Sequence, residues 1–238
     1  MHRRTMKLGA SLAIVALLGA ACGDDDDTTA DDPVGQTTEA PTTHSEGEGS
    51  SAIESGAAEL RAGLTSLLQE HVYLAGASIS AAVQAGGDLE APPVAAAVST
   101  LDANSVALSE AVGSVYGEDA GAQFLELWRT HIGFFVDYTL GGATGDAAKQ
   151  DAAKAALDDY RADFGAFVES ATGGELPADA VAENLQVHVD TLIEAIDAVL
   201  AGSPDVIPLL QAAAAHMPST AMALSGAIAT QMPDQFPS

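Results

Sequence analysis

Residues 119–140 read DAGAQFLELWRTHIGFFVDYTL, and the pattern in this stretch decides the fold class. Apolar side chains recur at spacings of three and four residues, which is the period of an α-helix with one buried face. The apolar stripe consists of Phe124, Leu127, Trp128, His131, Phe134, Phe135 and Tyr138. The stretch therefore predicts a helix that packs on a core and carries a histidine on its packed face.

Five further segments of residues 51–238 show the same period, and glycine or proline pairs separate most of them. The six helices are expected over about 55–85, 94–116, 119–140, 146–171, 177–200 and 203–232. Gly141 and Gly142 are expected to end the third helix, and Pro218 to kink the last one. Because helices joined by such short loops pack antiparallel, the sequence predicts an all-α antiparallel bundle of about six helices.

An internal duplication relates the helices to one another. Leu101-Asp102 lies 30 residues before His131, Leu157-Asp158 lies 31 residues before His188, and several positions between them match. The repeated unit is a histidine-bearing helix followed by a plain helix, and residues 67–72 (LLQEHV) repeat the histidine-bearing element. The first, third and fifth helices should therefore run in the same direction, with their histidines at similar depth.

Four histidines lie on the apolar stripes: His71, His131, His188 and His216. Burying an imidazole is costly unless its ring nitrogens find partners, so four of them in one domain need an explanation. Neutral imidazole is a good ligand for copper, zinc and iron, and facing helices of a bundle are where metal and haem sites are built. The sequence therefore predicts a binding module that captures copper, zinc or haem at these histidines.

Several polar residues could join or orient such ligands, namely Glu70, Asp102, Asn104, Asp137 and Asp190, and Met217 could serve a soft metal. The alternative is a metal-free interaction or scaffold protein of the cell envelope, docking to an envelope partner. Its histidines would be core residues copied by the duplication, each donating a hydrogen bond to a carbonyl or to an Asn or Asp of a neighbouring helix, such as Asn104 or Asn184. The histidine spacing does not decide between the two, since it contains no H-E-x-x-H motif and no cysteine partner.

Charge and motifs limit the remaining classes of function. The formal net charge of −26 disfavours binding to nucleic acids, whose phosphates the domain would repel. The sequence contains no G-x-S-x-G elbow, P-loop or dinucleotide fingerprint. We therefore expect a protein that binds a ligand or a partner, not an enzyme.

The N-terminal residues indicate where in the cell the protein is located. Residues 1–21 combine a short basic segment with an apolar run, as in a secretory signal peptide, and the run is too short to span a bilayer as a helix. Residues 18–22 (LGAAC) resemble the lipobox of bacterial lipoproteins, although Gly19 replaces the usual larger aliphatic residue. This resemblance implies that Cys22, the only cysteine, receives a lipid that anchors the protein to the extracytoplasmic face of the cell membrane. Residues 22–50, which are acidic and nearly free of apolar side chains, would form a disordered tether to the helical domain at 51–238.

Three segments carry a second resemblance: 67–72 (LLQEHV), 116–132 (YGEDAGAQFLELWRTHI) and 231–237 (QMPDQFP). They resemble a family of small helical proteins of Gram-positive bacteria that repeat a histidine-containing helix. The family has no established activity, so this resemblance implies a fold and no chemistry. Pro218, directly after Met217, departs from the family pattern at the fourth histidine.

Overall fold

The computed structural model describes residues 55–236, and their secondary structure is entirely helical apart from turns. The six helices are α2 (Gly56–Gln84), α3 (Pro92–Tyr116), α4 (Glu118–Thr144), α5 (Ala147–Ala171), α6 (Ala178–Ala201) and α7 (Val206–Gln231). The all-α fold of about six helices is thereby confirmed. The expected signal peptide, Cys22 and the whole of the expected tether (22–50) lie outside the described residues.

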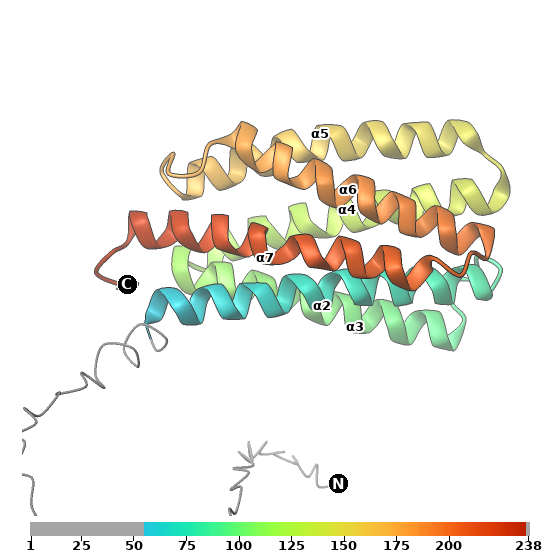
Figure 1. The fold of residues 1–238 in the computed structure, drawn as a ribbon, viewed down its shortest axis with the longest axis horizontal. Coiled ribbons are helices and arrows are strands. Elements are labelled where there is room, and N and C mark those ends of the chain that lie inside the picture. Colours follow the sequence, from blue (N-terminus) through green and yellow to red (C-terminus); the bar gives the residue numbers. More distant parts are fainter. Residues whose placement is uncertain (1–54, 237–238) are drawn as a thin grey trace, which may run out of the picture. The chain divides into compact units, whose positions relative to one another are not determined.

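The helices lie side by side in one compact unit (Figure 1). Each packs against the next along the chain, and α7 returns to pack along α2, so that the first and last described helices are neighbours. Only a few residues connect consecutive helices, and these turns lie at the two ends of the bundle (Figure 1). This arrangement is compatible with the expected antiparallel bundle. No helix of residues 55–236 is both long and apolar enough to cross a membrane.

Local chemistry explains where the helices begin and end. Ser55 and Asp146 precede α2 and α5, and their side chains accept hydrogen bonds from the backbone N–H groups of Ala58 and Lys149, at 3.2 and 3.0 Å. Such caps satisfy N–H groups that have no partner within the helix. At the other end, α4 stops at Gly145, whose φ of 71° lies in the left-handed region that favours glycine.

The end of α4 corrects the expectation that Gly141 and Gly142 stop this helix. Both glycines lie inside α4, which continues to Thr144. A Cβ atom at Gly141 would lie 3.0 Å from the backbone nitrogen of Gln150 on α5, and one at Gly142 would lie 2.4 Å from a methyl carbon of Leu200 on α6. The two glycines therefore allow close approach of neighbouring helices and do not act as a helix stop.

The apolar stripes meet in a single core that all six helices share. Leu108, Leu157, Leu192 and Ile196 are among its most deeply buried side chains. Burying a side chain of this size contributes about 1.5–3 kcal/mol, which is why the three-to-four-residue period outweighs weaker local preferences. Pro218 lies inside α7, and the helix continues on both sides of it.

Candidate metal centre

Three of the four histidines converge in the core. His71 on α2, His131 on α4 and His188 on α6 are 2, 3 and 5% exposed. The ring centroid of His71 lies 5.5 Å from that of His131 and 6.4 Å from that of His188. One potential ligand atom from each residue lies within 4.8 Å of the other two, the only such group found within residues 55–236. We call these three residues the histidine cluster.

The helical period explains why the three histidines of the cluster point into the core. Each histidine occupies a stripe position flanked by core residues: Leu68 and Ala75 on α2, for example, lie about one turn before and after His71, and both are buried. The three helices that carry the cluster, α2, α4 and α6, alternate along the chain with α3, α5 and α7. The expectation that the repeated histidines lie at similar depth agrees with their convergence at one point.

The cluster concentrates unpaired polar atoms. The Nδ1 atoms of all three histidines are buried and have no hydrogen bond of good geometry, although Asn104 lies beside His71 and the backbone of Trp128 lies beside His131. The same holds for Asn104 Oδ1, Trp128 Nε1 and the hydroxyl of Tyr160. Trp128 packs against His71 and His131 at centroid distances of 4.9 and 4.6 Å, and Tyr160 stacks on His131 at 4.9 Å. Because buried polar groups are nearly always paired, this concentration of atoms without a close partner marks the cluster as the candidate site.

The environment keeps the imidazoles neutral. Burial lowers the pKa of His71 to about 3, with a further decrease from the nearby His188 and an opposing effect from Asn104. Burial also lowers the pKa of His188 to about 4, and the charge of His216 acts in the same direction. The pKa of His131 falls well below its usual value for the same principal reason, burial. All three rings are therefore unprotonated at neutral pH, which is the form that binds metals.

The spacing of the cluster suits a metal ion after a small adjustment. Three atoms within 4.8 Å of one another have a common centre at most about 2.8 Å from each. Metal–imidazole bonds to zinc are about 2.0–2.1 Å long, so each nitrogen would move inward by less than about 1 Å. Small rotations of the three side chains supply such a movement. Three nitrogens also leave a fourth coordination position open, as in catalytic zinc sites.

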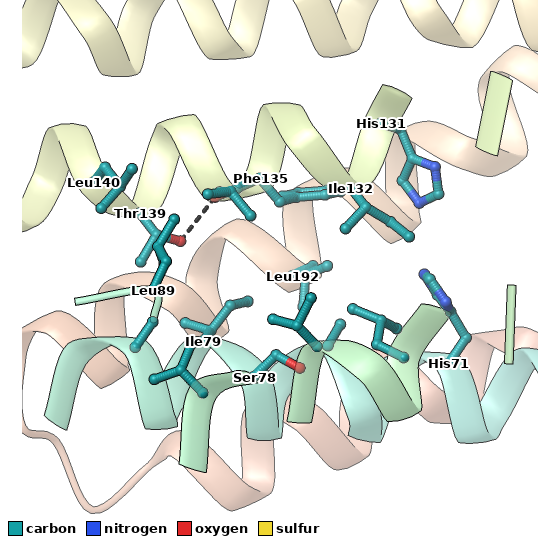
Figure 2. Close-up of a pocket in the computed structure, with 16 residues that line it drawn as sticks. His71, Ser78, Ile79, Leu89, His131, Ile132, Phe135, Thr139, Leu140 and Leu192 are labelled. Carbon is teal, nitrogen blue, oxygen red and sulfur yellow. Dashed lines mark hydrogen bonds between the residues drawn. The ribbon is translucent and has the colours of Figure 1, made fainter. Parts of the chain in front are cut away.

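Two apolar cavities adjoin the cluster. The first, of about 90 Å³, has His71 and His131 in its wall (Figure 2). The second, of about 80 Å³, is bordered by His71, His188, Trp128 and Met217. Pockets for larger ligands usually measure about 300–1,000 Å³. A porphyrin therefore does not fit either cavity, and of the expected ligands the metal ions suit this site and haem does not.

The polar residues expected near the ligands differ in position. Asn104 is buried beside His71, and its amide nitrogen donates to the carbonyl of Leu67 at 3.1 Å and to the carboxylate of Glu70 at 2.9 Å. Glu70 itself is exposed and reaches the cluster only through this amide. Asn104 thus links a surface carboxylate to the surroundings of His71.

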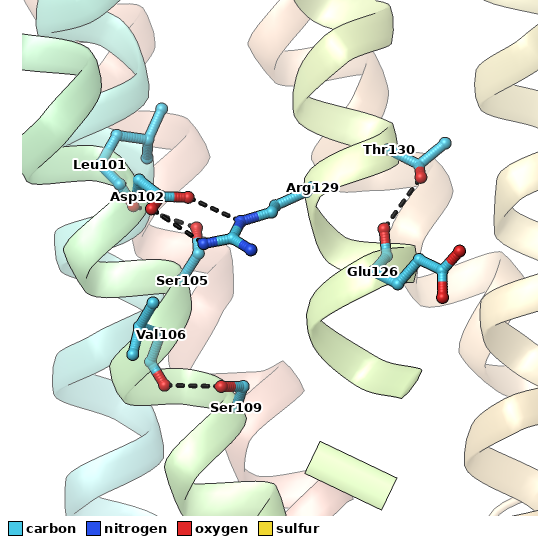
Figure 3. A network of polar contacts seen from close by, with 8 residues as sticks. All are labelled: Leu101, Asp102, Ser105, Val106, Ser109, Glu126, Arg129 and Thr130. Atoms are coloured by element: carbon cyan, nitrogen blue, oxygen red, sulfur yellow. Dashed lines mark hydrogen bonds and ion pairs between the residues drawn. The ribbon is translucent and has the colours of Figure 1, made fainter. Parts of the chain in front are cut away.

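The three aspartates bind other partners at the surface. Asp102 on α3 accepts two hydrogen bonds from Arg129 on α4, at 2.7 and 2.9 Å (Figure 3). Asp137 forms an ion pair with Lys149 at 2.9 Å, and Asp190 accepts a hydrogen bond from Gln186 at 2.6 Å. Asp137 and Asp190 are exposed, and the Asp102 side chain is about half exposed. These contacts join helices or helical turns and do not orient the histidine rings.

His216 on α7 lies outside the histidine cluster. Its Nε2 atom is 3.2 Å from the backbone carbonyl oxygen of Asn184, and its Nδ1 atom is 3.4 Å from the hydroxyl of Ser219. This half-buried ring has the partners that the alternative of structural histidines requires. Met217, its neighbour in sequence, is buried in the wall of the second cavity.

Helical periodicity puts Trp128 on the apolar stripe of α4, but it does not reveal that Trp128 and Tyr160 border the cluster. Their contacts with His71 and His131 depend on how α2, α4 and α5 pack, so helical periodicity does not reveal them. The available signal was that both are aromatic residues with a polar atom on a stripe, where such atoms normally need a partner. No family model, no curated protein and no solved structure matches the chain.

Proposed function

We propose that this domain binds one transition metal ion through a ring nitrogen of each of His71, His131 and His188. The observation that carries the proposal is that one ring nitrogen of each of the three buried histidines lies within 4.8 Å of the other two. A metal ion at the centre of the cluster would fix the orientation of the three rings.

The charge of the site favours copper in its monovalent state. Among the described residues the cluster contains neutral imidazoles and no carboxylate, and apolar cavities border it on two sides. The cost of moving an ion into a medium of low dielectric rises with the square of its charge, so a divalent ion is much less favourable without an anionic ligand. Imidazole binds copper and zinc well. We therefore propose Cu(I) as the ion, and Zn²⁺ with a bound anion as the second candidate.

Metal titration of the chain purified without a polyhistidine tag tests the proposal. We expect one equivalent of Cu(I) to be taken from a coloured chelator under anaerobic conditions. His188→Leu should weaken binding by more than the roughly 10–100-fold that loss of an outer partner causes, because it removes a ligand. His216→Leu is the matched control and should bind as the wild type does, since His216 lies outside the cluster.

The outcomes of this titration separate the two candidate functions. Stoichiometric uptake that depends on His188 supports the metal-binding function. If wild type takes up neither copper nor zinc, the metal-binding function is rejected and a metal-free interaction protein with structural histidines remains. His216 has a backbone carbonyl partner at 3.2 Å, whereas no hydrogen bond of good geometry reaches the Nδ1 atoms of the cluster.

We also propose that the domain acts as a binding protein on the extracytoplasmic face of the membrane, anchored through a lipid on Cys22. The basic and apolar leader that precedes this single cysteine supports the proposal. Radiolabelled palmitate should be incorporated into the wild-type chain, and Cys22→Ala should abolish both the label and recovery in the membrane fraction. A Cys22→Ala chain that remains in the membrane fraction would reject the anchor.

A further inference from the structure

The first cavity leads from the surface of the bundle to the histidine cluster. It is lined by residues of α2, α3, α4 and α6 and by Leu89 from the turn between α2 and α3. Figure 2 shows His71 and His131 facing each other at one end of the cavity, and Leu89 and Leu140 near the other. Leu192 lies between the two ends (Figure 2). The cavity therefore places apolar space directly beside two of the proposed metal ligands.

The outer end of this cavity is accessible. Leu89 and Val98 line it, and they are 42% and 46% exposed although both are large apolar side chains. The same two residues and Val136 also line a hollow on the surface. A small molecule could thus reach the cavity at this point by displacing only exposed side chains.

The wall of the cavity offers little to water. Apart from the two histidines, its polar side chains are Ser78 and Thr139. Each hydroxyl donates its hydrogen bond to a carbonyl of its own helix, those of Leu74 and Phe135, both at 2.8 Å. A buried water normally needs two to four polar partners, whereas apolar cavities stay dry and take apolar ligands. The chemistry of the wall therefore selects an uncharged, apolar occupant.

The size of the cavity limits that occupant. A dry apolar cavity of about 150 Å³ accommodates benzene or xenon. The cavity beside the cluster measures about 90 Å³, so it suits a molecule of two or three heavy atoms. A metal held by three histidines has a coordination position to spare, and His71 and His131 belong both to the cluster and to the cavity wall.

We propose that the first cavity admits a small apolar molecule, of the class of the diatomic gases, to the metal ion at the histidine cluster, an inference that rests on the proposed metal-binding function. The ligand would occupy the open coordination position, while the three imidazoles hold the ion. Binding in this form involves no transfer of electrons or protons.

Carbon monoxide is the probe for this site, because it binds Cu(I) and its C–O stretch reports coordination. The Cu(I)-loaded wild-type chain should show a single bound C–O band in the infrared. Ala75→Leu fills the inner part of the cavity, since Ala75 is buried in its wall one turn from His71, and should lose the band while retaining copper. Ala77→Leu makes the same change at an exposed position of α2 and should keep the band.

Two further measurements protect the test against a misfolded variant. Val98→Trp changes a half-exposed residue at the outer end and should slow carbon monoxide association without loss of copper. Xenon should shift the methyl resonances of Leu101, Ile132 and Leu192 in the metal-free wild-type chain, but not in Ala75→Leu. The first measurement examines the path to the metal, and the second examines the cavity without the metal.

The possible results distinguish the two proposals. A copper-dependent band that is lost in Ala75→Leu and kept in Ala77→Leu supports the inference. Copper binding without a band, or an unchanged band in Ala75→Leu, overturns the inference and leaves the metal-binding function intact. Failure of the wild-type chain to take up copper or zinc overturns the metal-binding function, and the inference with it.

Discussion

Replacing His188 by leucine should stabilise the metal-free domain. The Nδ1 atom of His188 is buried without a hydrogen bond, and such an atom costs about 1–3 kcal/mol. Leucine has a similar volume and no polar atom, and volume-conserving changes in a core usually cost less than about 1.5 kcal/mol. The net expectation is a gain of about 1 kcal/mol, which for a domain of this size raises the melting temperature by about 2–4 °C.

The assay is thermal unfolding followed by circular dichroism at neutral pH in the presence of a chelator. His216→Leu is the matched control, because it removes a ring nitrogen that lies 3.2 Å from the carbonyl of Asn184. Loss of that contact should lower stability by about 0.5–1.5 kcal/mol, the opposite sign from His188→Leu. Added Cu(I) should stabilise the wild type and His216→Leu, but have little effect on His188→Leu. If His188→Leu instead lowers the melting temperature as His216→Leu does, His188 is a satisfied structural residue and the reasoning is refuted.

Two further predictions concern pH and packing. Because the pKa values of His71, His131 and His188 in the folded state lie below 6.5, the unfolded chain alone takes up protons just below that pH. The free energy of unfolding, measured by urea titration, should therefore be highest above about pH 6.5 and should fall on acidification towards pH 4. The expected decrease is up to about 1.4 kcal/mol per histidine per pH unit. A free energy of unfolding that does not change with pH would contradict this prediction. Gly165→Ala should destabilise the fold by about 1–3 kcal/mol, because the added Cβ atom would lie 2.5 Å from the carbonyl oxygen of Ala178. The control is Gly133→Ala on α4, where the added Cβ atom meets open space. This variant should stabilise the fold by up to about 1 kcal/mol, because alanine favours a helix over glycine. Equal melting temperatures for the two alanine variants would count against the packing of α5 on α6.

The helices illustrate what the sequence reveals and where it misleads. The expected segments agree with α2 to α7 to within a few residues, because burial of an apolar stripe imposes a period that is visible in the sequence. The largest error was the end of α4, four residues beyond the expected Leu140. Glycine pairs end α2 and α5 with positive φ angles at Gly86 and Gly173, but a pair of the same composition packs inside α4. Sequence alone does not distinguish the two uses, since a close approach between helices depends on residues far away in the chain.

The candidate site, too, could be predicted in part from the sequence and in part only from the structure. Periodicity and the internal duplication led to the prediction that His71, His131 and His188 share a buried face at similar depth, and they do lie together. His216 met the same criteria but lies elsewhere, with a partner of its own. Asp137 and Asp190 were candidates because each follows a histidine on the same helix, and Asp102 because it lies on a neighbouring helix, yet all three have partners at the surface.

The sequence by itself determined an acidic, all-α domain with histidines on its buried stripes, because helical period, helix caps and charge are properties of neighbouring residues. Only the tertiary structure decided which three histidines meet, since successive histidines of the cluster lie more than fifty residues apart in sequence and their approach depends on the packing of the whole bundle. It also decided that Trp128 and Tyr160 border them without hydrogen-bond partners. The apolar cavities on either side have the same origin, because a cavity is the space that side chains from several helices leave between them, and no single segment encodes it.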